Sequence, residues 1–519
     1  MLKRIGLKNV RSFKNLKNFE FKPITVLCGT NSSGKSSIIK TILLWKQTLE
    51  QESLTRPGFL MNGRFTKLGS HNNFLYNKAK NKILETSFQF EFKKEGRTFD
   101  SELKEFVPTF PHIIEKLINL TISENEENSA DYIELDFTLR YKADEESYLG
   151  IYIKQYILKI TPFTNNSKKY PRKNKANVDN NFNTMEIKIT SVKSENYKIE
   201  WENIAYRGVT ETYLEGEDHI KRFVDCKKGQ MTVPTCNFDN IFETLLTLDV
   251  GIEYNGKIVN GGQVEFEEEP FPILRILQIA NRLGSVLEVL FAKITYIGPL
   301  REEPSRRYIF EDSVDDIGVK GENSAFLYHQ EGGLFIEYMV FDSIKEEFVE
   351  TGALAREAIG YWLSEIGIFG FTSDKIEELY RFSLNANEFG DEKVNISDVG
   401  FGVSQVVPIV IQGLLMDESE SLILEQPEIH LHPKMQMKLA DFILSLALHG
   451  KKVIIETHSE HIINRFVRRI VEDKSGKLNS LIGINFIKNT ADGSICEAVN
   501  LSETKGIENW PEEFFDQAR

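Results

Sequence analysis

The chain contains few cysteines, the residues that cross-link small domains through disulfide bonds or bind structural zinc. Its four cysteines are Cys28, Cys226, Cys236 and Cys496, and no two of them form a close CxxC pair. Neither a zinc finger nor a disulfide framework is therefore indicated. No apolar run reaches the roughly 18 residues needed to cross a bilayer, and the first residues contain no apolar core of a signal peptide. We expect a cytoplasmic protein with reduced thiols and no membrane partner.

An excess of positive charge is also missing. The 63 Lys and Arg residues are outnumbered by 77 Asp and Glu residues, which gives a net charge of −14. Proteins that coat DNA without sequence preference are usually basic. The net charge therefore excludes a protein whose whole surface binds DNA, although it does not exclude a local basic patch. Heptads are not sustained over several turns, which argues against a long coiled-coil arm. The length of 519 residues predicts two or three domains.

Short apolar runs that resemble buried strands occur near both ends of the chain, at Ile24–Cys28, Leu422–Leu424 and Val453–Ile455. A helix is predicted over Pro433–Leu448, because proline favours the first turn and Gly450 follows the last. Strand, helix, strand in this order implies a parallel sheet. We predict an α/β fold whose parallel-sheet core is formed by the N- and C-terminal parts, with a central α+β insertion. The predicted domains are residues 1–95, 96–294 and 295–519.

A phosphate-binding loop follows the first of these strands. The segment Gly29–Ser36 fits G-x-x-x-x-G-K-[ST] without a mismatch and lies between a predicted strand and a predicted helix. Glycines let successive N–H groups point at phosphate oxygens, and the helix N-terminus adds positive potential. Lys35 is expected to reach the β/γ-phosphates of ATP and Ser36 to bind Mg²⁺. The candidate nucleotide-binding residues here are Gly29, Asn31, Ser32, Ser33, Gly34, Lys35, Ser36 and Ser37.

An acidic residue ends the strand Leu422–Leu424. Glu425 at this place can hold Mg²⁺ opposite Ser36, directly or through water. The residues that follow are Gln426-Pro427-Glu428-Ile429-His430-Leu431-His432-Pro433.

This run resembles the motif of ABC-type ATPases grouped with SMC, RecF and the OLD-like defence ATPases. The resemblance implies ATP and Mg²⁺ as cofactors. In that family a glutamate directly after the Mg²⁺ acid polarises the attacking water, whereas this chain has Gln426, whose amide cannot accept the proton. Either Glu428 takes that role, or hydrolysis is slow and ATP acts mainly as a clamp. A glutamine here is also common in related defence ATPases.

Two further motifs follow the family's order. Asp398–Gln405 resembles the signature loop and is predicted to open a helix over Val406–Leu415, with Ser404 as its cap. In the family this loop faces the γ-phosphate bound by another subunit, so two copies are needed, as a homodimer or a higher even-numbered homo-oligomer. His458 matches the family's switch histidine. The signature residues are Gly400, Gly402, Ser404 and Gln405.

Weaker signals leave alternatives open. Arg11 resembles a family residue near the nucleotide, or is a solvated charge; Arg301 reads phosphate or pairs with an acid. The basic stretch 168–175 is a solvated loop or a nucleic-acid contact. The tail Asn509–Asp516 resembles that of a bacterial subgroup whose members accompany nucleases, such as the ATPase subunits of Septu and Septu-like retron systems. Its aromatic residues close the core or anchor a partner.

Only 61 residues follow His458 (519 − 458), too few for the Toprim nuclease domain of OLD proteins. We therefore expect a regulatory ATPase subunit of an antiphage complex that gates a separate effector chain, an HNH-type nuclease. The alternative is a RecF- or SMC-like DNA repair or recombination ATPase that binds DNA directly. A transporter subunit is disfavoured by the SMC-like motifs and the long insertion.

Overall fold

The computed structural model describes residues 1–50, 59–78, 83–95, 98–99, 132–143, 151–163, 185–192, 196–202, 228–234, 252–254, 257–259, 287–309, 316–376, 379–390, 392–418 and 420–508. The basic stretch 168–175 and the tail 509–516 lie outside the described residues. Residues 287–292 are helical.

The chain forms two compact units, and each draws on sequence-distant segments. The sheet unit comprises Met1–Glu20, Leu44–Gly63 and Lys67–Ala292. The head unit comprises Phe21–Leu43, Arg64–Thr66 and Lys293–Arg519. The strands Leu2–Val10, Phe13–Glu20 and Ile83–Glu95 thus join the same sheet as those of the predicted insertion, whereas Ile24–Gly29 belongs to the head unit. The division at residues 95 and 294 stays a prediction.

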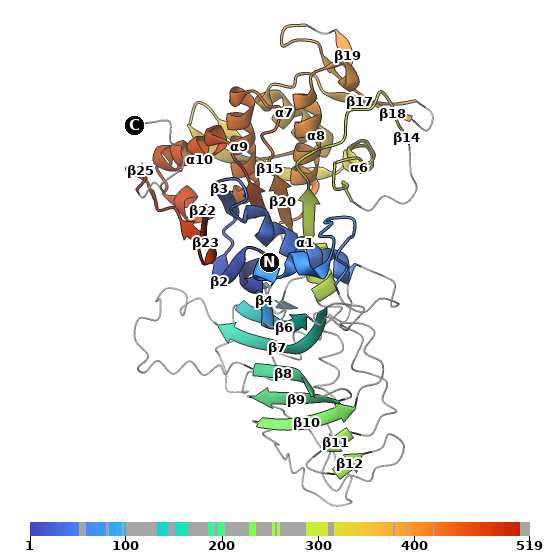
Figure 1. Ribbon diagram of the computed structural model, residues 1–519. Coiled ribbons are helices and arrows are strands. Elements are labelled where there is room, and N and C mark those ends of the chain that lie inside the picture. Colours follow the sequence, from blue (N-terminus) through green and yellow to red (C-terminus); the bar gives the residue numbers. More distant parts are fainter. Residues whose placement is uncertain are drawn as a thin grey trace, which may run out of the picture. The chain divides into compact units, whose positions relative to one another are not determined.

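The head unit contains a six-stranded sheet in the order β13-β20-β21-β3-β22-β23. Figure 1 labels β3, β20, β22 and β23 of this sheet. The four pairs from β13 to β22 are parallel, and only β22 and β23 are antiparallel. The N-terminal strand β3 lies between two C-terminal strands, so the predicted parallel core built from both ends of the chain is confirmed. The bounds are β3 Ile24–Gly29, β13 Ile294–Ile297, β20 Ser421–Glu425, β21 Lys452–Glu456, β22 Ile482–Thr490 and β23 Gly493–Ala498.

Local sequence determines where the helices of the head unit begin. The ring of His432 accepts a hydrogen bond from the Lys434 N–H at the start of α9, and Pro433 occupies its first turn. Ser459 caps α10 through the Ile462 N–H. The predicted helix Pro433–Leu448 is confirmed to the residue. The helices are α1 Lys35–Leu49, α6 Ser324–Glu331, α7 Ala355–Ile366, α8 Phe401–Leu415, α9 Pro433–Leu448, α10 Glu460–Glu472 and α11 Lys477–Leu481.

The start of α8 differs from the prediction. The helix begins at Phe401 with Gly400 as its N-cap, so the signature segment already forms its first turn. Ser404 lies inside the helix, where its hydroxyl donates to the Phe401 carbonyl at 2.8 Å. The prediction that Ser404 caps this helix is wrong, because the glycine at 400 adopts the extended cap conformation and leaves serine one turn further along.

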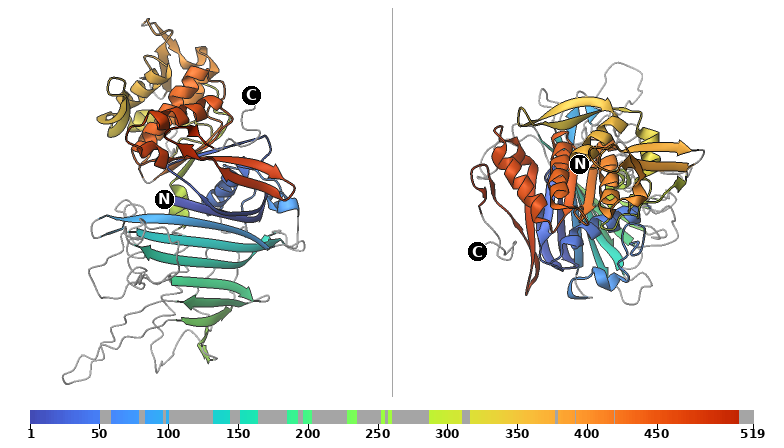
Figure 2. Two further views of the ribbon diagram at one scale, coloured as in Figure 1. Left: turned by 90° about the vertical axis from the view of Figure 1, so that its left-hand side faces the viewer. Right: turned by 90° about the horizontal axis from the view of Figure 1, so that it is seen from above.

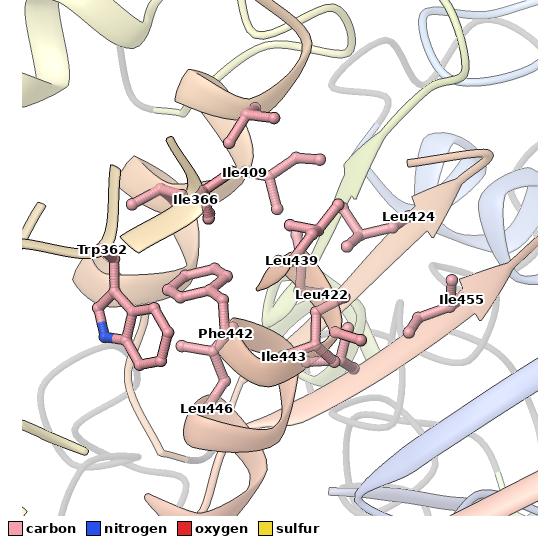
Figure 3. Packing of buried hydrophobic residues seen from close by; sticks show 14 of the residues in the cluster. Trp362, Ile366, Ile409, Leu422, Leu424, Leu439, Phe442, Ile443, Leu446 and Ile455 are labelled. Atoms are coloured by element: carbon pink, nitrogen blue, oxygen red, sulfur yellow. The ribbon is translucent and has the colours of Figure 1, made fainter. Parts of the chain in front are cut away.

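The core of the head unit lies between β20, β21 and the helices α7, α8 and α9. Trp362 of α7 stacks edge-on against Phe442 of α9, with ring centroids 5.3 Å apart. Figure 3 shows this pair together with Ile409 of α8 and Leu422 of β20. Strands buried on both faces read as continuous apolar runs, which explains the sequences of β20 and β21.

Short hairpins complete the head unit. β15 Phe335–Asp342 pairs with β16 Glu347–Leu354. A second small sheet has the order β14-β18-β17, and β19 pairs with β18. Its strands are β14 Tyr308–Ile309, β17 Thr372–Ile376, β18 Leu379–Asn385 and β19 Lys393–Asn395, and β24 Leu501–Ser502 pairs with β25 Gly506–Ile507.

The sheet unit is an eleven-stranded sheet in the order β12-β11-β10-β9-β8-β7-β6-β4-β1-β2, with β5 beside β4. Figure 2 (left) shows its teal and green strands side by side. Trp45, near the end of α1, contacts Phe88, Phe137 and Phe291 edge-on or stacked. The bounds are β1 Leu2–Val10, β2 Phe13–Glu20, β4 Ile83–Glu95, β5 Thr98–Phe99, β6 Tyr132–Ala143, β7 Ile151–Phe163, β8 Met185–Val192, β9 Asn196–Glu202, β10 Lys228–Pro234, β11 Ile252–Tyr254 and β12 Lys257–Val259.

Throughout the described part of the chain, no helix has the length and hydropathy needed to cross a membrane.

Candidate functional site

The phosphate loop connects β3 to α1, as the sequence predicts. Gly29 and Gly34 have φ values of +136° and +106°, and Ser32 has a φ of +59°. These left-handed conformations curl the backbone, which is how such loops turn their N–H groups inward. Asn31 and Ser32 are exposed, whereas Ser33 and Ser37 are buried. The loop therefore presents its tip to solvent above a buried base.

Gly29 is required by a close backbone approach. A Cβ at this position would lie 2.1 Å from the carbonyl oxygen of Ile487 on β22. The neighbouring strands also hold the far side of the loop. Asn489 donates to the Ser32 carbonyl at 2.9 Å, and Ser494 donates to the Ser33 carbonyl at 2.6 Å. The loop is thus fixed by β22 and β23 rather than by its own residues alone.

Lys35 folds back over the loop. Its ammonium donates to the carbonyls of Gly29 at 3.1 Å and Thr30 at 2.8 Å. Only 4% of the residue is exposed, and burial lowers the pKa of Lys35, while the Glu456 carboxylate opposes that shift. The ammonium therefore lies against the phosphate loop. A bound anion could replace the two carbonyl oxygens as its hydrogen-bond acceptors.

Two glutamates end neighbouring strands beside this loop. Glu425 of β20 and Glu456 of β21 are paired in register. The hydroxyl of Ser36 donates to the Glu456 carboxylate at 2.9 Å. Glu425 was expected from the sequence; Glu456 was not. The same signal was available for both, because Val453–Ile455 is also an apolar strand followed by a glutamate.

Burial dominates the electrostatics of this carboxylate pair. Burial and the neighbouring Glu456 carboxylate raise the pKa of Glu425 to about 7, against opposing contributions from Lys40, the Tyr296 hydroxyl and Arg301. Burial also raises the pKa of Glu456. Two like charges in a low-dielectric site disfavour joint ionisation unless a cation joins them.

The loop after β20 has an unusual backbone. Gln426 and His430 both have positive φ, at +46° and +61°. The N–H of Gln426 donates to the Glu456 carbonyl at 2.7 Å, which ties the ends of β20 and β21 together. Non-glycine residues in this region cost on the order of 1 kcal/mol or more each and persist only where the surroundings enforce them.

Arg301 helps to hold the backbone of this loop in its left-handed conformation. Its guanidinium donates to the carbonyls of Gln426 at 3.1 Å and Glu425 at 3.2 Å. Burial lowers the pKa of Arg301 to about 10, and the nearby Glu428 carboxylate opposes the shift. Arg301 thus holds the backbone at the end of β20, a contact that neither sequence interpretation of this residue foresaw.

Glu428 and His458 are linked directly. One carboxylate oxygen of Glu428 accepts the backbone N–H of His458 at 2.8 Å. Burial raises the pKa of Glu428. Burial and the Lys35 ammonium lower the pKa of His458, which places this exposed histidine within the field of the phosphate-loop lysine. The structure therefore gathers Lys35, Ser36, Glu425, Glu428 and His458 at one edge of the sheet.

The signature segment packs against the same loop. A Cβ on Gly402 would lie 3.0 Å from the His430 carbonyl, and the Phe401 and His430 rings are 5.9 Å apart. Gln405 is buried, and its amide approaches the Ser404 hydroxyl at 3.5 Å. Gly400 has open space around its Cα. The role of Gly400, Gly402, Ser404 and Gln405 toward a second subunit stays a prediction.

Other candidate residues lie elsewhere. Arg11 belongs to the sheet unit, with a φ of +50° and a backbone bond to Phe74, so its assignment to the nucleotide site stays a prediction. In the described ranges, no group of three or more His, Cys, Asp or Glu side chains is arranged to hold a metal ion by itself. Cys28 and Cys496 carry free thiols.

The residues present fit a nucleotide with a divalent cation. The buried Glu425 and Glu456 each have one carboxylate oxygen without a hydrogen-bond partner, and the buried Ser33 hydroxyl has none either. Carboxylates and hydroxyls are the ligands that Mg²⁺ prefers. Ser36 and Glu425 would hold Mg²⁺, and the curled loop with Lys35 would hold phosphates.

Residues 320–463 match a family model described as an AAA ATPase domain. The match spans the signature segment, Glu425 and His458 but not the phosphate loop. No curated protein matches the chain.

Three solved structures of SMC heads are similar at low identity. The SMC head domain from Thermotoga maritima is 12% identical with a TM-score of 0.36, over 96% of this chain and 99% of that chain. The Smc head bound to the C-winged helix domain of ScpA is 10% identical with a TM-score of 0.37, over 96% and 98%. The Pyrococcus furiosus Smc head with an extended coiled coil, bound to the C-terminal domain of ScpA, is 11% identical with a TM-score of 0.34, over 96% of both chains. TM-scores this low leave the fold to be judged from the strand order above.

Proposed function

We propose that this chain binds ATP with Mg²⁺ and hydrolyses it slowly. One observation carries the proposal: the hydroxyl of Ser36, the first helical serine after the phosphate-loop lysine, bonds Glu456 beside the strand-end Glu425. Phosphate loop, cation ligands and strand-end acids thus meet at the carboxyl edge of a parallel sheet, where such folds bind ligands.

The roles follow from the contacts. The loop Gly29–Ser37 takes the phosphates, and Lys35 exchanges its bonds to loop carbonyls for phosphate oxygens. When bound, ATP supplies the phosphoanhydride that is cleaved, and Mg²⁺ offsets its charge. Gln426 orients water without accepting its proton, so turnover is slow. His458, whose pKa is lowered by burial and by the Lys35 ammonium, contacts the terminal phosphate in this proposal.

Two copies of the chain complete each site. The N-terminus of α8, with Gly400 at its cap, offers the positive end of a 15-residue helix to an anion from outside the subunit. One chain has one phosphate loop and one such segment, so ATP joins two heads into a homodimer or a higher even-numbered assembly.

In the cell, the ATP-closed assembly holds a separate effector chain, an HNH-type nuclease, as a regulatory subunit of a cytoplasmic antiphage defence complex. The Gln426 variant of the ATPase motif, shared with related defence ATPases, supports this role.

The test is to purify the chain with its native gene neighbours, with and without ATP, and to determine mass and composition. A stoichiometric nuclease that co-elutes only with ATP is expected. A bare dimer whose ATPase rate rises with duplex DNA would replace this proposal with the DNA repair function. In parallel, Lys35→Ala should abolish ATP binding, and retained tight binding would refute the phosphate-loop assignment.

A further inference from the structure

Glu456 has a position that the phosphate-loop and strand-end motifs do not account for. It ends β21, the strand between β3 and β20, and is paired in register with Glu425. In a parallel sheet, such neighbours lie about 4.8 Å apart, with side chains on the same face. Of the two glutamates, Glu456 is the one that accepts the Ser36 hydroxyl, at 2.9 Å. Ser36, assigned above as a cation ligand, is thus oriented by a second carboxylate.

Both carboxylates are buried and incompletely bonded. Glu425 is 8% exposed and Glu456 is 5% exposed. One oxygen of each, Oε1 of Glu425 and Oε2 of Glu456, has no hydrogen-bond partner. The ammonium of Lys35 donates to the carbonyls of Gly29 and Thr30. Ionising a buried carboxylate whose oxygen has no partner is costly, so this pair favours a bound cation.

We propose that Glu456 is a second carboxylate ligand of the divalent cation, acting with Glu425 and Ser36, and that this trio binds the cation before any nucleotide arrives. The inference deepens the proposed ATPase function and rests on it. Three hard oxygen donors with two negative charges suit Mg²⁺ or Mn²⁺, bound directly or through water. A site served by one carboxylate, in contrast, depends on the nucleotide phosphates to retain its metal.

The competing explanation is that Glu456 only orients Ser36. Glu456→Gln separates the two, because the amide oxygen still accepts the Ser36 hydroxyl but the charge is gone. Glu425→Gln is the second test variant. Glu337→Gln is the matched control, since it removes an exposed glutamate from β15 in the same unit.

The experiment titrates Mn²⁺ into the full chain without nucleotide and measures free Mn²⁺ by its electron paramagnetic resonance signal. Wild type and Glu337→Gln should bind one Mn²⁺ per chain with equal affinity, and Glu456→Gln and Glu425→Gln should each bind at least tenfold more weakly. Mn²⁺ should raise the melting temperature of wild type but not of Glu456→Gln, whose cation-free melting temperature shows whether it is folded. Wild-type affinity in Glu456→Gln, or no saturable site in wild type, would overturn the proposal.

Nucleotide binding in excess chelator, followed with a fluorescent ATP analogue, separates this inference from the ATPase proposal. Wild type and Glu456→Gln should bind the analogue equally well there, since the phosphate loop is intact in both. If wild type binds no nucleotide under any condition, the ATPase proposal fails. If it binds nucleotide but the Mn²⁺ affinities of the variants are unchanged, only the role of Glu456 fails.

Discussion

The carboxylate of Glu428 accepts the backbone N–H of His458 across 2.8 Å. This bond joins the loop after β20 to the loop after β21. It occupies one of the two oxygens that a general base would use, and burial keeps the other without a partner. The contact ties the loop of His458 to Glu428, and the slow hydrolysis proposed from Gln426 stays a prediction.

Replacements at Glu428 should therefore depend on hydrogen bonding more than on charge. We expect Glu428→Gln to keep kcat for phosphate release within about threefold of wild type, because its amide oxygen still accepts the His458 N–H. Glu428→Ala should lower it by about tenfold, since the His458 N–H loses its acceptor, a bond that contributes about 0.5–1.5 kcal/mol. A loss of about 10²-fold or more in Glu428→Gln would instead identify Glu428 as the general base.

Gln426→Glu should raise turnover by about tenfold or more, because it restores a carboxylate next to the strand-end acid, where it can accept the proton of the attacking water. The measurement is steady-state phosphate release at saturating ATP and Mg²⁺. Gln426→Asn serves as the control, since it alters side-chain length without adding a base. An unchanged rate in Gln426→Glu would mean that the water is positioned by another residue.

Gly29→Ala should abolish ATP binding and lower the free energy of unfolding by more than about 3 kcal/mol. The added Cβ would lie 2.1 Å from the Ile487 carbonyl oxygen, and the φ of +136° disfavours any L side chain. Urea unfolding and ATP-binding measurements test this. Near-normal binding in the variant would show that the loop can move away from β22.

Gly400→Ala offers the opposite case. Nothing lies within 4 Å of a Cβ at this position, and its φ of −60° suits any residue. The free energy of unfolding should stay within about 1 kcal/mol of wild type, while ATP-dependent dimerisation falls, because the added methyl group blocks close approach of a partner's phosphate. Light scattering with ATP measures the mass. Undiminished dimerisation would remove Gly400 from the subunit contact.

The free energy of unfolding should rise with pH because the buried Lys451 has a lowered pKa. The ammonium of Lys451 donates to the carbonyls of Gly413 and Leu414 near the end of α8, and burial lowers its pKa to about 8. Between that value and the ordinary value of 10.5, the unfolded chain binds more protons than the folded one, so raising the pH favours folding.

Lys451→Met isolates this contribution. The free energy of unfolding of wild type should gain on the order of 1–3 kcal/mol relative to the variant between pH 8 and pH 10.5. Urea unfolding at several pH values measures the difference. A difference that is constant over this range would show that Lys451 titrates normally in the folded state.

The sequence predicted those parts of the head that local chemistry dictates. The helix Pro433–Leu448 follows from a proline at its start and a glycine past its end, and the phosphate loop follows from its glycine spacing. The cap of α8 was placed wrongly because the prediction favoured a hydroxyl residue at 404 over a glycine at 400.

Long-range relationships were not predictable in the same way. Glu456 was overlooked because the strand was interpreted through His458 alone, and only the pairing of β20 with β21 brings the two glutamates together. The eleven-stranded sheet was missed as a unit because its N-terminal strands precede the phosphate loop in sequence. Pairing across such distances depends on tertiary packing, which periodicity does not encode.

The left-handed backbone at Gln426 and His430 has a consequence for how the head can change state. Two of the residues that follow β20 have a strained backbone, while the strand itself is fully buried. A strained loop lowers its free energy when it relaxes. Loss of the Arg301 bonds to the Glu425 and Gln426 carbonyls should therefore let this loop relax, at the edge of the sheet where the phosphate loop lies.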